Sequence, residues 1–178
     1  MSTRKRCRNV LYFAPRLLLA SVFMVVIGAI ALSNFDTLEP YLAPLHLAQK
    51  PATCYGSSIT MGPFPELADL VRLKKERGID LDISLLDDDL PQEKALDGKL
   101  AREDRGLDIE YMNVPLNYLR LNGAVSKKRI ADLAAFLKAH PKRKVYIHCY
   151  LGRHRVGAVR EELMRQGVIA PGESVAKL

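Results

Sequence analysis

The chain has 178 residues, of which 48% are hydrophobic, and its formal net charge is +7. This length suits about one domain of ordinary size, and so large an apolar share excludes a disordered chain. Its three cysteines are too few for a disulfide-stabilised scaffold. The net charge alone indicates no particular partner, because the charge is distributed very unevenly along the chain.

The first 16 residues carry most of the positive charge, with five basic residues and no acidic one. An apolar run from Leu17 to Leu32 follows, and the next charged residues are Asp36 and Glu39. A membrane-spanning helix needs about 20 apolar residues, and its basic flank stays in the cytoplasm. We therefore predict a cytoplasmic basic tail and a transmembrane signal-anchor in residues 1–33. The rest of the chain would lie on the extracytoplasmic side, which is the periplasm if the cell is bacterial.

Two other interpretations of this segment stay open. A basic stretch before an apolar one is also typical of a cleaved signal peptide, and Ala29-Ile30-Ala31 offers a small-residue cleavage site. The segment could also be a core helix, although such a helix is seldom apolar on every face. Three prolines in residues 34–52 predict a tether, so residues 53–178 are expected to form the globular domain.

Strand-like and helix-like patterns alternate in this domain. Strands are predicted at 54–61, 79–86, 107–114 and 144–149, and helices at 66–77, 127–139 and 156–166, with a charged stretch at 87–106 that could hold a short helix. Gly78 is expected to end the first helix and Ser126 to cap the second. Strand 79–86 alternates in polarity and is predicted to be half-buried. The whole indicates an α/β domain with a central sheet of about four to five strands flanked by helices.

The segment from His148 to Gly157 lies between a predicted strand and a predicted helix. Such a turn aims backbone N–H groups and the positive end of the helix dipole at the loop, which favours a bound anion. The same field stabilises a thiolate, so Cys149 is a candidate nucleophile. Arg155 lies six positions later, where its planar guanidinium could bind two phosphate oxygens. These residues together predict a nucleophile beside a phosphoryl group.

His148-Cys149, five further residues and Arg155, with Gly152 in the loop, resemble the signature of the cysteine-based protein tyrosine phosphatase superfamily, specifically its compact dual-specificity group. The resemblance extends over roughly residues 53–167 and implies that fold. No metal and no cofactor are expected, because the sequence has no zinc-like cysteine and histidine spacing and no nucleotide-binding glycine pattern. It also implies that Cys149 forms a phosphocysteine intermediate, that Arg155 binds the phosphate, and that His148 orders the loop. The loop amides would come from Tyr150, Leu151, Gly152, Arg153 and His154.

Three departures from the family pattern bear on turnover. Val156 stands where the family has a hydroxyl residue that helps the intermediate break down, so slower turnover is expected. Asn117 stands where the family has its general acid, an aspartate. Asp87, Asp88 and Asp89 are candidates for that role if their loop folds over the site; otherwise they form a solvated acidic loop. Only residues 156–178 follow Arg155, so a shortened domain is expected.

The expected function is that of a protein tyrosine or dual-specificity phosphatase. The alternatives are a phospholipid or inositol (pyro)phosphate phosphatase, a catalytically impaired phosphate-binding module, and a rhodanese-like sulfurtransferase, which the position of Arg155 disfavours. The run from Gly152 to Arg155 also resembles an atypical plant and fungal subgroup that acts on inositol pyrophosphates. Expected partners are a phosphorylated protein or phospholipid and the membrane, but no nucleic acid; the basic stretch 141–160 suits a phospholipid head group. Cys54 could pair with Cys149 or remain a free thiol.

Overall fold

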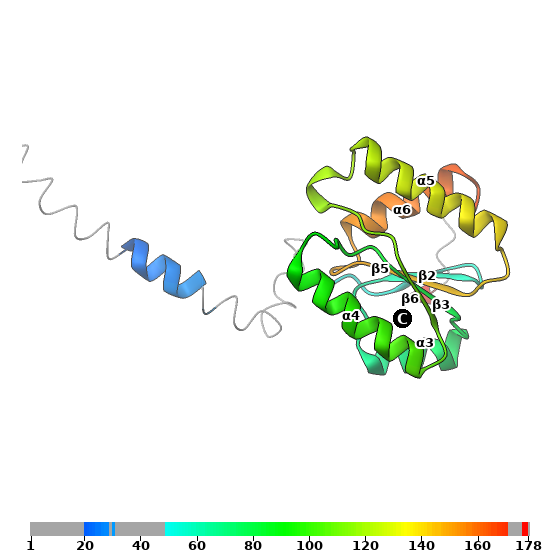
Figure 1. The fold of residues 1–178 in the computed structure, drawn as a ribbon, viewed down its shortest axis with the longest axis horizontal. Coiled ribbons are helices and arrows are strands. Elements are labelled where there is room, and N and C mark those ends of the chain that lie inside the picture. The colour runs from blue at the N-terminus through cyan, green and yellow to red at the C-terminus, as the bar shows by residue number, and fades with distance from the viewer. Residues whose placement is uncertain (1–19, 29, 31–48, 171–175, 178) are drawn as a thin grey trace, which may run out of the picture. The chain divides into compact units, whose positions relative to one another are not determined.

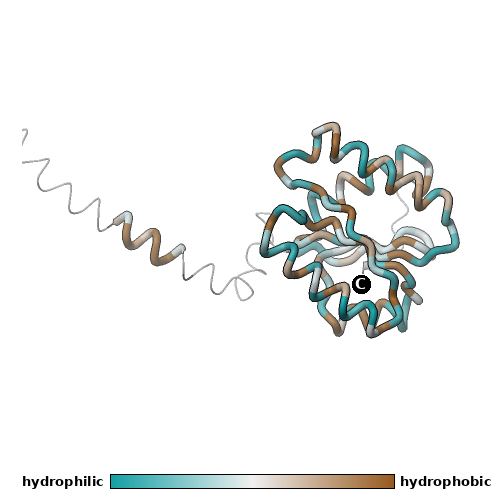
Figure 2. Tube along the Cα trace, in the orientation of Figure 1, coloured by the Kyte–Doolittle hydropathy of each residue, from teal (hydrophilic) through white to brown (hydrophobic). Residues whose placement is uncertain are grey.

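The computed structural model describes residues 20–28, 30, 49–170, 176 and 177, and the chain divides into two units, 1–48 and 49–178. In the first unit, residues 20–28 form an exposed and largely apolar helix (Figures 1 and 2). None of the helices in the described part combines the length and apolar content that a membrane crossing requires, so the predicted anchor gains no support there. The remainder of the predicted anchor, and residues 34–48 of the predicted tether, lie outside the described residues.

The second unit is an α/β domain whose described strands form one six-stranded sheet in the order β4-β3-β5-β2-β1-β6. Four strands, β2, β3, β4 and β5, run parallel; β1 is antiparallel to both β2 and β6. The strands are β1 (Thr53–Tyr55), β2 (Ile59–Gly62), β3 (Leu81–Ser84), β4 (Glu110–Asn113), β5 (Val145–His148) and β6 (Ala176–Lys177). The predicted strand at 54–61 is thus a hairpin, and the two-residue β6 had not been predicted.

The helices are α3 (Leu67–Arg77), α4 (Pro91–Gly106), α5 (Ala124–Ala139) and α6 (His154–Arg165), with a 3-10 turn at Tyr118–Arg120. Helices α5 and α6 cover one face of the sheet, and α3 and α4 cover the other (Figure 1). The largest apolar core lies on the α5 and α6 side, where Leu81 and Ile83 of β3 and Val145 and Ile147 of β5 are buried. The predicted α/β class is confirmed.

Two of the predicted helix ends can be checked directly. Gly78 ends α3 in the left-handed conformation, with a φ of 66°, as predicted. The predicted cap at Ser126 is wrong, because α5 begins at Ala124 after Gly123 and buries Ser126 within its first turn. The charged stretch holds a long helix rather than a short one, because α4 begins at Pro91, a residue well suited to the first turn, and buries Leu100.

Strand β3 corrects the prediction of a half-buried strand, since all four of its residues are buried. It lies between β4 and β5, and helices cover both of its faces. The polar residues Asp82 and Ser84 therefore face α4 instead of water. Each has a polar neighbour there: Asp82 lies 3.4 Å from His148, and Ser84 donates a hydrogen bond to Asp97 at 2.6 Å.

Candidate active site

The site is built at the carboxyl ends of the parallel strands, where ligands bind in open α/β sheets. Strand β5 lies between β2 and β3, so the segments that follow β2, β3 and β5 meet at one edge. Residues 149–153 connect β5 to α6, and no side chain caps the first amides of α6. These amides and the helix dipole thus favour an anion beside the loop.

Gly152 holds the loop close to the exit of β2. Its φ is +64°, and a Cβ atom there would lie 2.6 Å from both the carbonyl carbon of Gly62 and the nitrogen of Pro63. A side chain at this position would therefore clash with backbone that cannot move freely. It would also be strained, because the left-handed conformation disfavours residues with a Cβ atom.

Backbone hydrogen bonds tie the same loop down. The carbonyl of Tyr150 accepts from the amide of Phe64 at 3.2 Å, and that of Leu151 accepts from Lys50 at 2.9 Å. Cys149, directly before them, is only 5% exposed. The loop that carries the candidate nucleophile is therefore anchored to two segments distant in the sequence.

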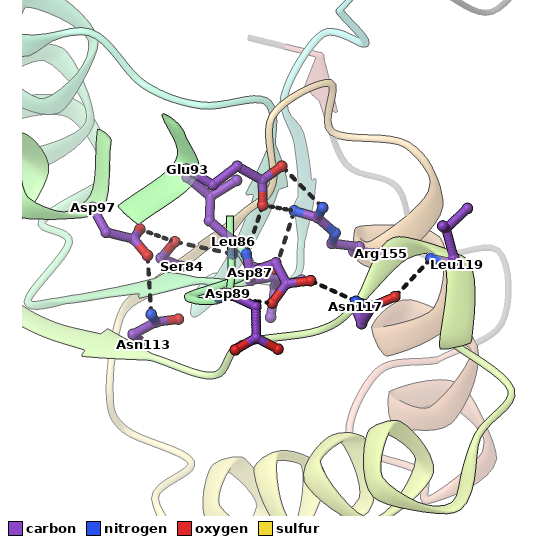
Figure 3. Close-up of polar contacts among 11 residues, drawn as sticks. Ser84, Leu86, Asp87, Asp89, Glu93, Asp97, Asn113, Asn117, Leu119 and Arg155 are labelled. Atoms are coloured by element: carbon purple, nitrogen blue, oxygen red, sulfur yellow. Dashed lines mark hydrogen bonds and ion pairs between the residues drawn. The ribbon is translucent and has the colours of Figure 1, made fainter. Parts of the chain in front are cut away.

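Arg155 reaches back from the first turn of α6 into this site and is almost fully buried. Its Nη1 and Nη2 donate to the two carboxylate oxygens of Glu93, at 2.8 and 2.9 Å, and Nη1 also lies 3.4 Å from the carbonyl oxygen of Leu85 (Figure 3). Its Nε is buried and has no partner among the described residues. A buried donor without a partner indicates where an anionic ligand would bind.

Glu93 is the site residue that the sequence did not reveal. It lies in the first turn of α4, and its carboxylate also accepts from the backbone amide of Asp87 at 2.6 Å. An acid in the first turn of a helix is common for electrostatic reasons alone, so its sequence signal was too weak to single it out.

The three candidate acids occupy different environments. Asp87 is buried, and its carboxylate accepts hydrogen bonds from the side-chain amide of Asn117 at 2.8 Å and from the backbone of Asp89 at 3.2 Å. Asp88 and Asp89 are exposed, and the side chain of Asp89 points away from Arg155 (Figure 3). Of the three, the structure joins only Asp87 to the Glu93–Arg155 pair and to Asn117.

Cys149 and Arg155 line the same pocket, which has a volume of about 260 Å³. Its other lining residues are Leu90, Glu93, Tyr118, Tyr150, Leu151 and His154. The side chains of Leu90, Tyr118 and Tyr150 are each more than two-fifths exposed, so apolar surface surrounds the opening. Gly152 and Arg153 line a different cavity, beside Lys50 and Pro51.

Beneath the loop, the sheet buries titratable groups against α4. Asp82 and Asp104 are fully buried, as is His148, whose Nε2 lies 3.4 Å from Asp82. Burial and the neighbouring Asp82 raise the pKa of Asp104 to about 8. Burial and the same carboxylate also hold the pKa of Tyr146 well above its usual value.

The remaining sequence expectations concern the two thiols, Val156 and the basic stretch 141–160. Cys54 and Cys149 are both free thiols, and Cys54 accepts a hydrogen bond from Thr60 instead. Val156 is buried in the apolar core next to Arg155, so its side chain offers no hydroxyl to the loop. Of the basic residues in 141–160, Arg143 lies at the opposite end of β5, where it pairs with Asp80 and Glu110.

No family model and no curated protein matches the sequence. Among solved structures, a DUF442 protein from Shewanella putrefaciens, described as a proposed phosphatase, has a TM-score of 0.53 at 15% identity, over 71% of this chain and 74% of that one. The Cydia pomonella PTP-2 phosphatase has a TM-score of 0.49 at 20% identity, over 67% and 72%. The core of the Saccharomyces cerevisiae PP-IP phosphatase Siw14 has a TM-score of 0.45 at 16% identity, over 72% and 81%. The DUF442 structure confirms the predicted phosphatase-like fold.

Proposed function

We propose that this chain is a cysteine-dependent phosphomonoesterase. The observation that carries the proposal is the pocket in which the Cys149 thiol and the buried Arg155 guanidinium meet at an uncapped helix N-terminus. The unpartnered Nε of Arg155 and the amides of the loop would hold the phosphoryl oxygens. An anion with three equatorial oxygens matches this set of donors.

The reaction would proceed in two displacements. The Cys149 sulfur attacks phosphorus, an S–P bond forms, and the P–O bond to the leaving group breaks. Water then attacks the phosphocysteine, the S–P bond breaks, and inorganic phosphate leaves with the thiolate restored. Arg155 would stabilise the charge on the equatorial oxygens in both steps.

A phosphorylated tyrosine in a protein is the substrate class that we favour. The exposed apolar side chains of Leu90, Tyr118 and Tyr150 at the pocket suit an aromatic ring attached to the phosphate. A phospholipid or an inositol (pyro)phosphate is the alternative, supported by His154, which lines the pocket. An aryl or pyrophosphate leaving group also needs less protonation, which suits a site with Asn117 in place of an acid.

Phosphate release by the full-length protein tests this function. The panel consists of p-nitrophenyl phosphate, a phosphotyrosine peptide, a phosphoserine peptide, a phosphoinositide, phosphatidylglycerol phosphate and an inositol pyrophosphate. We expect the phosphotyrosine peptide to be hydrolysed faster than the phosphoserine peptide, and Cys149→Ser to abolish release. Cys54→Ala is the matched control, because it removes the other buried thiol away from the pocket. Equal release by wild type and Cys149→Ser would overturn the mechanism.

A second candidate function is a phosphate-binding module with impaired turnover. Val156 and Asn117 favour it, since neither can supply the hydroxyl or the acidic proton that turnover uses. Binding of a phosphotyrosine peptide without phosphate release would support this function. Fast turnover of the same peptide would eliminate it.

A further inference from the structure

Three fully buried titratable side chains lie in a row behind the nucleophile loop. Asp104 comes from α4, Asp82 from β3 and His148 from the end of β5. Asp82 is the neighbouring acid that acts on the Asp104 carboxyl, and Asp82 Oδ2 lies 3.4 Å from His148 Nε2. His148 is joined through its backbone to Cys149.

The polar atoms of these three side chains lack ordinary hydrogen-bond partners among the described residues. In these three side chains, the buried atoms without a partner are both carboxylate oxygens of Asp82, both of Asp104 and both ring nitrogens of His148. Such groups cost free energy unless they satisfy one another. Two adjacent carboxyl groups can do so if one holds a proton, because an ionised pair would repel and leave all of its acceptors unpaired.

We propose that Asp104, Asp82 and His148 form a proton-sharing chain that positions the nucleophile loop, and that loss of the Asp104 proton weakens anion binding at alkaline pH. In the acidic form, the Asp104 O–H donates to Asp82, and Asp82 accepts the Nε2–H of His148. In the alkaline form, the Asp104 proton has passed to solvent, and the chain carries one more negative charge.

The described groups that act on this row are almost all acids. From the packed elements, the groups that act on these carboxylates or on their neighbours Tyr111 and Tyr146 include Glu103 and Asp97 of α4, Cys149 of the loop, and Asp69 and Arg72 of α3. Only Arg72 among them is positive, and it pairs with Asp69 at 2.9 Å. In the described part of the chain, His148 is the basic side chain paired with Asp82.

The backbone offers a route from this chain to the phosphate site. The carbonyl of His148 accepts from the amide of Leu85 at 2.9 Å, and the carbonyl of Leu85 lies 3.4 Å from Arg155 Nη1. The His148 ring is held between Phe64 and Tyr146, whose centroids lie 5.6 and 5.8 Å from it. A shift of His148 would therefore move Cys149 and change the contact between Leu85 and Arg155. Because Asp82 and Asp104 hold His148 in place, they are positioning residues.

This inference rests on the proposed function only for its anion site, so the test measures binding rather than turnover. Inorganic sulfate is the probe, because its charge is constant between pH 6 and pH 9.5. Titration calorimetry on the full-length wild type should show binding that weakens about tenfold as pH rises through the Asp104 pKa of about 8. Asp104→Asn keeps a donor toward Asp82 and cannot ionise, so its affinity should fall much less over this pH range than that of the wild type.

Two further variants sharpen the test. Asp82→Ala removes the acceptor for His148 and should weaken sulfate at every pH, whereas Asp132→Asn, which changes an exposed acid on α5, should behave as wild type. The same pH dependence in Asp104→Asn as in wild type, or no sulfate binding by wild type, would overturn the proposal. pH-dependent sulfate binding without phosphate release would refute the phosphatase alone and leave the proton-sharing chain intact.

Discussion

Glu93 and Arg155 form a bidentate ion pair at the floor of the candidate active site, although 62 positions separate them in the sequence. The side chain of Arg155 is 6% exposed and that of Glu93 15%. Such a pair fixes the plane of the guanidinium and leaves its Nε edge for a ligand.

Removing Glu93 should destabilise the protein. Glu93→Ala leaves a buried arginine without its counter-ion, which typically costs about 3 kcal/mol or more in the free energy of unfolding. Urea denaturation measures that loss, and added phosphate should recover part of it by binding Arg155. Glu162→Ala is the control, because Glu162 pairs with the exposed Arg165 and should change stability by about 1 kcal/mol or less. Equal losses in the two variants would contradict this account of the pair.

Gly152→Ala should displace the loop. The added Cβ would lie 2.6 Å from backbone atoms of Gly62 and Pro63 at a φ of +64°, and the left-handed conformation alone costs about 1–2 kcal/mol. We expect lower stability and a large loss of phosphate release. Gly157→Ala is the matched control: nothing lies within 4 Å of its Cβ position in α6, so it should raise the melting temperature slightly. A fully active Gly152→Ala enzyme would show that the tight contact is not needed.

Asn117→Asp should supply the proton donor that the site lacks. The new carboxyl would lie against Asp87, which now accepts from Asn117 at 2.8 Å, and the two acids would share one proton. Since general acid catalysis contributes about 10²–10⁴ in rate, kcat/KM for phenyl phosphate should rise relative to that for p-nitrophenyl phosphate. The control is Asn113→Asp, which places a carboxyl against Asp97 away from the pocket. An unchanged substrate ratio in Asn117→Asp would exclude this role for the position.

Val156→Thr should speed breakdown of the phosphocysteine. We expect the wild type to release p-nitrophenol in a burst followed by a slower steady rate, because Val156 offers no hydroxyl. The variant should raise the steady rate with little change in the burst, as stopped-flow absorbance would show. Burying a hydroxyl in this apolar environment should cost about 1–3 kcal/mol of stability. A wild type without any burst would mean that breakdown is not the slow step.

The contribution of Asp104 to the stability of the protein should fall as pH rises from about 4 to about 8. Native Asp104 holds its proton up to a pKa of about 8, while the unfolded chain releases it near 3.8. Between these values the unfolded state binds fewer protons, so the free energy of unfolding decreases with pH. Chemical denaturation at several pH values measures the slope, which should be shallower in Asp104→Asn. Parallel curves for the two proteins would show that Asp104 does not hold its proton in the native state.

The sequence by itself determined the strand, turn and helix around the candidate nucleophile, because these three elements are continuous and each has a local pattern. The short run Val145-Tyr146-Ile147 predicted β5, and the helical pattern from Val156 placed Arg155 at the base of α6. The sequence also led to the prediction of a membrane anchor in residues 1–33, which stays a prediction.

Tertiary structure decided what surrounds that loop. Asp87 and Asn117 are 30 positions apart, and they meet because the segments after β3 and β4 end at the same edge of the sheet. The alternation in β3 could not tell a solvated face from a buried polar one, since both place Asp82 on the side opposite the apolar core. The packing of α4 on that side, which brings Asp104 near Asp82, buries this polar face of β3. The local pattern of the strand could not show this, because helix packing depends on contacts between distant segments.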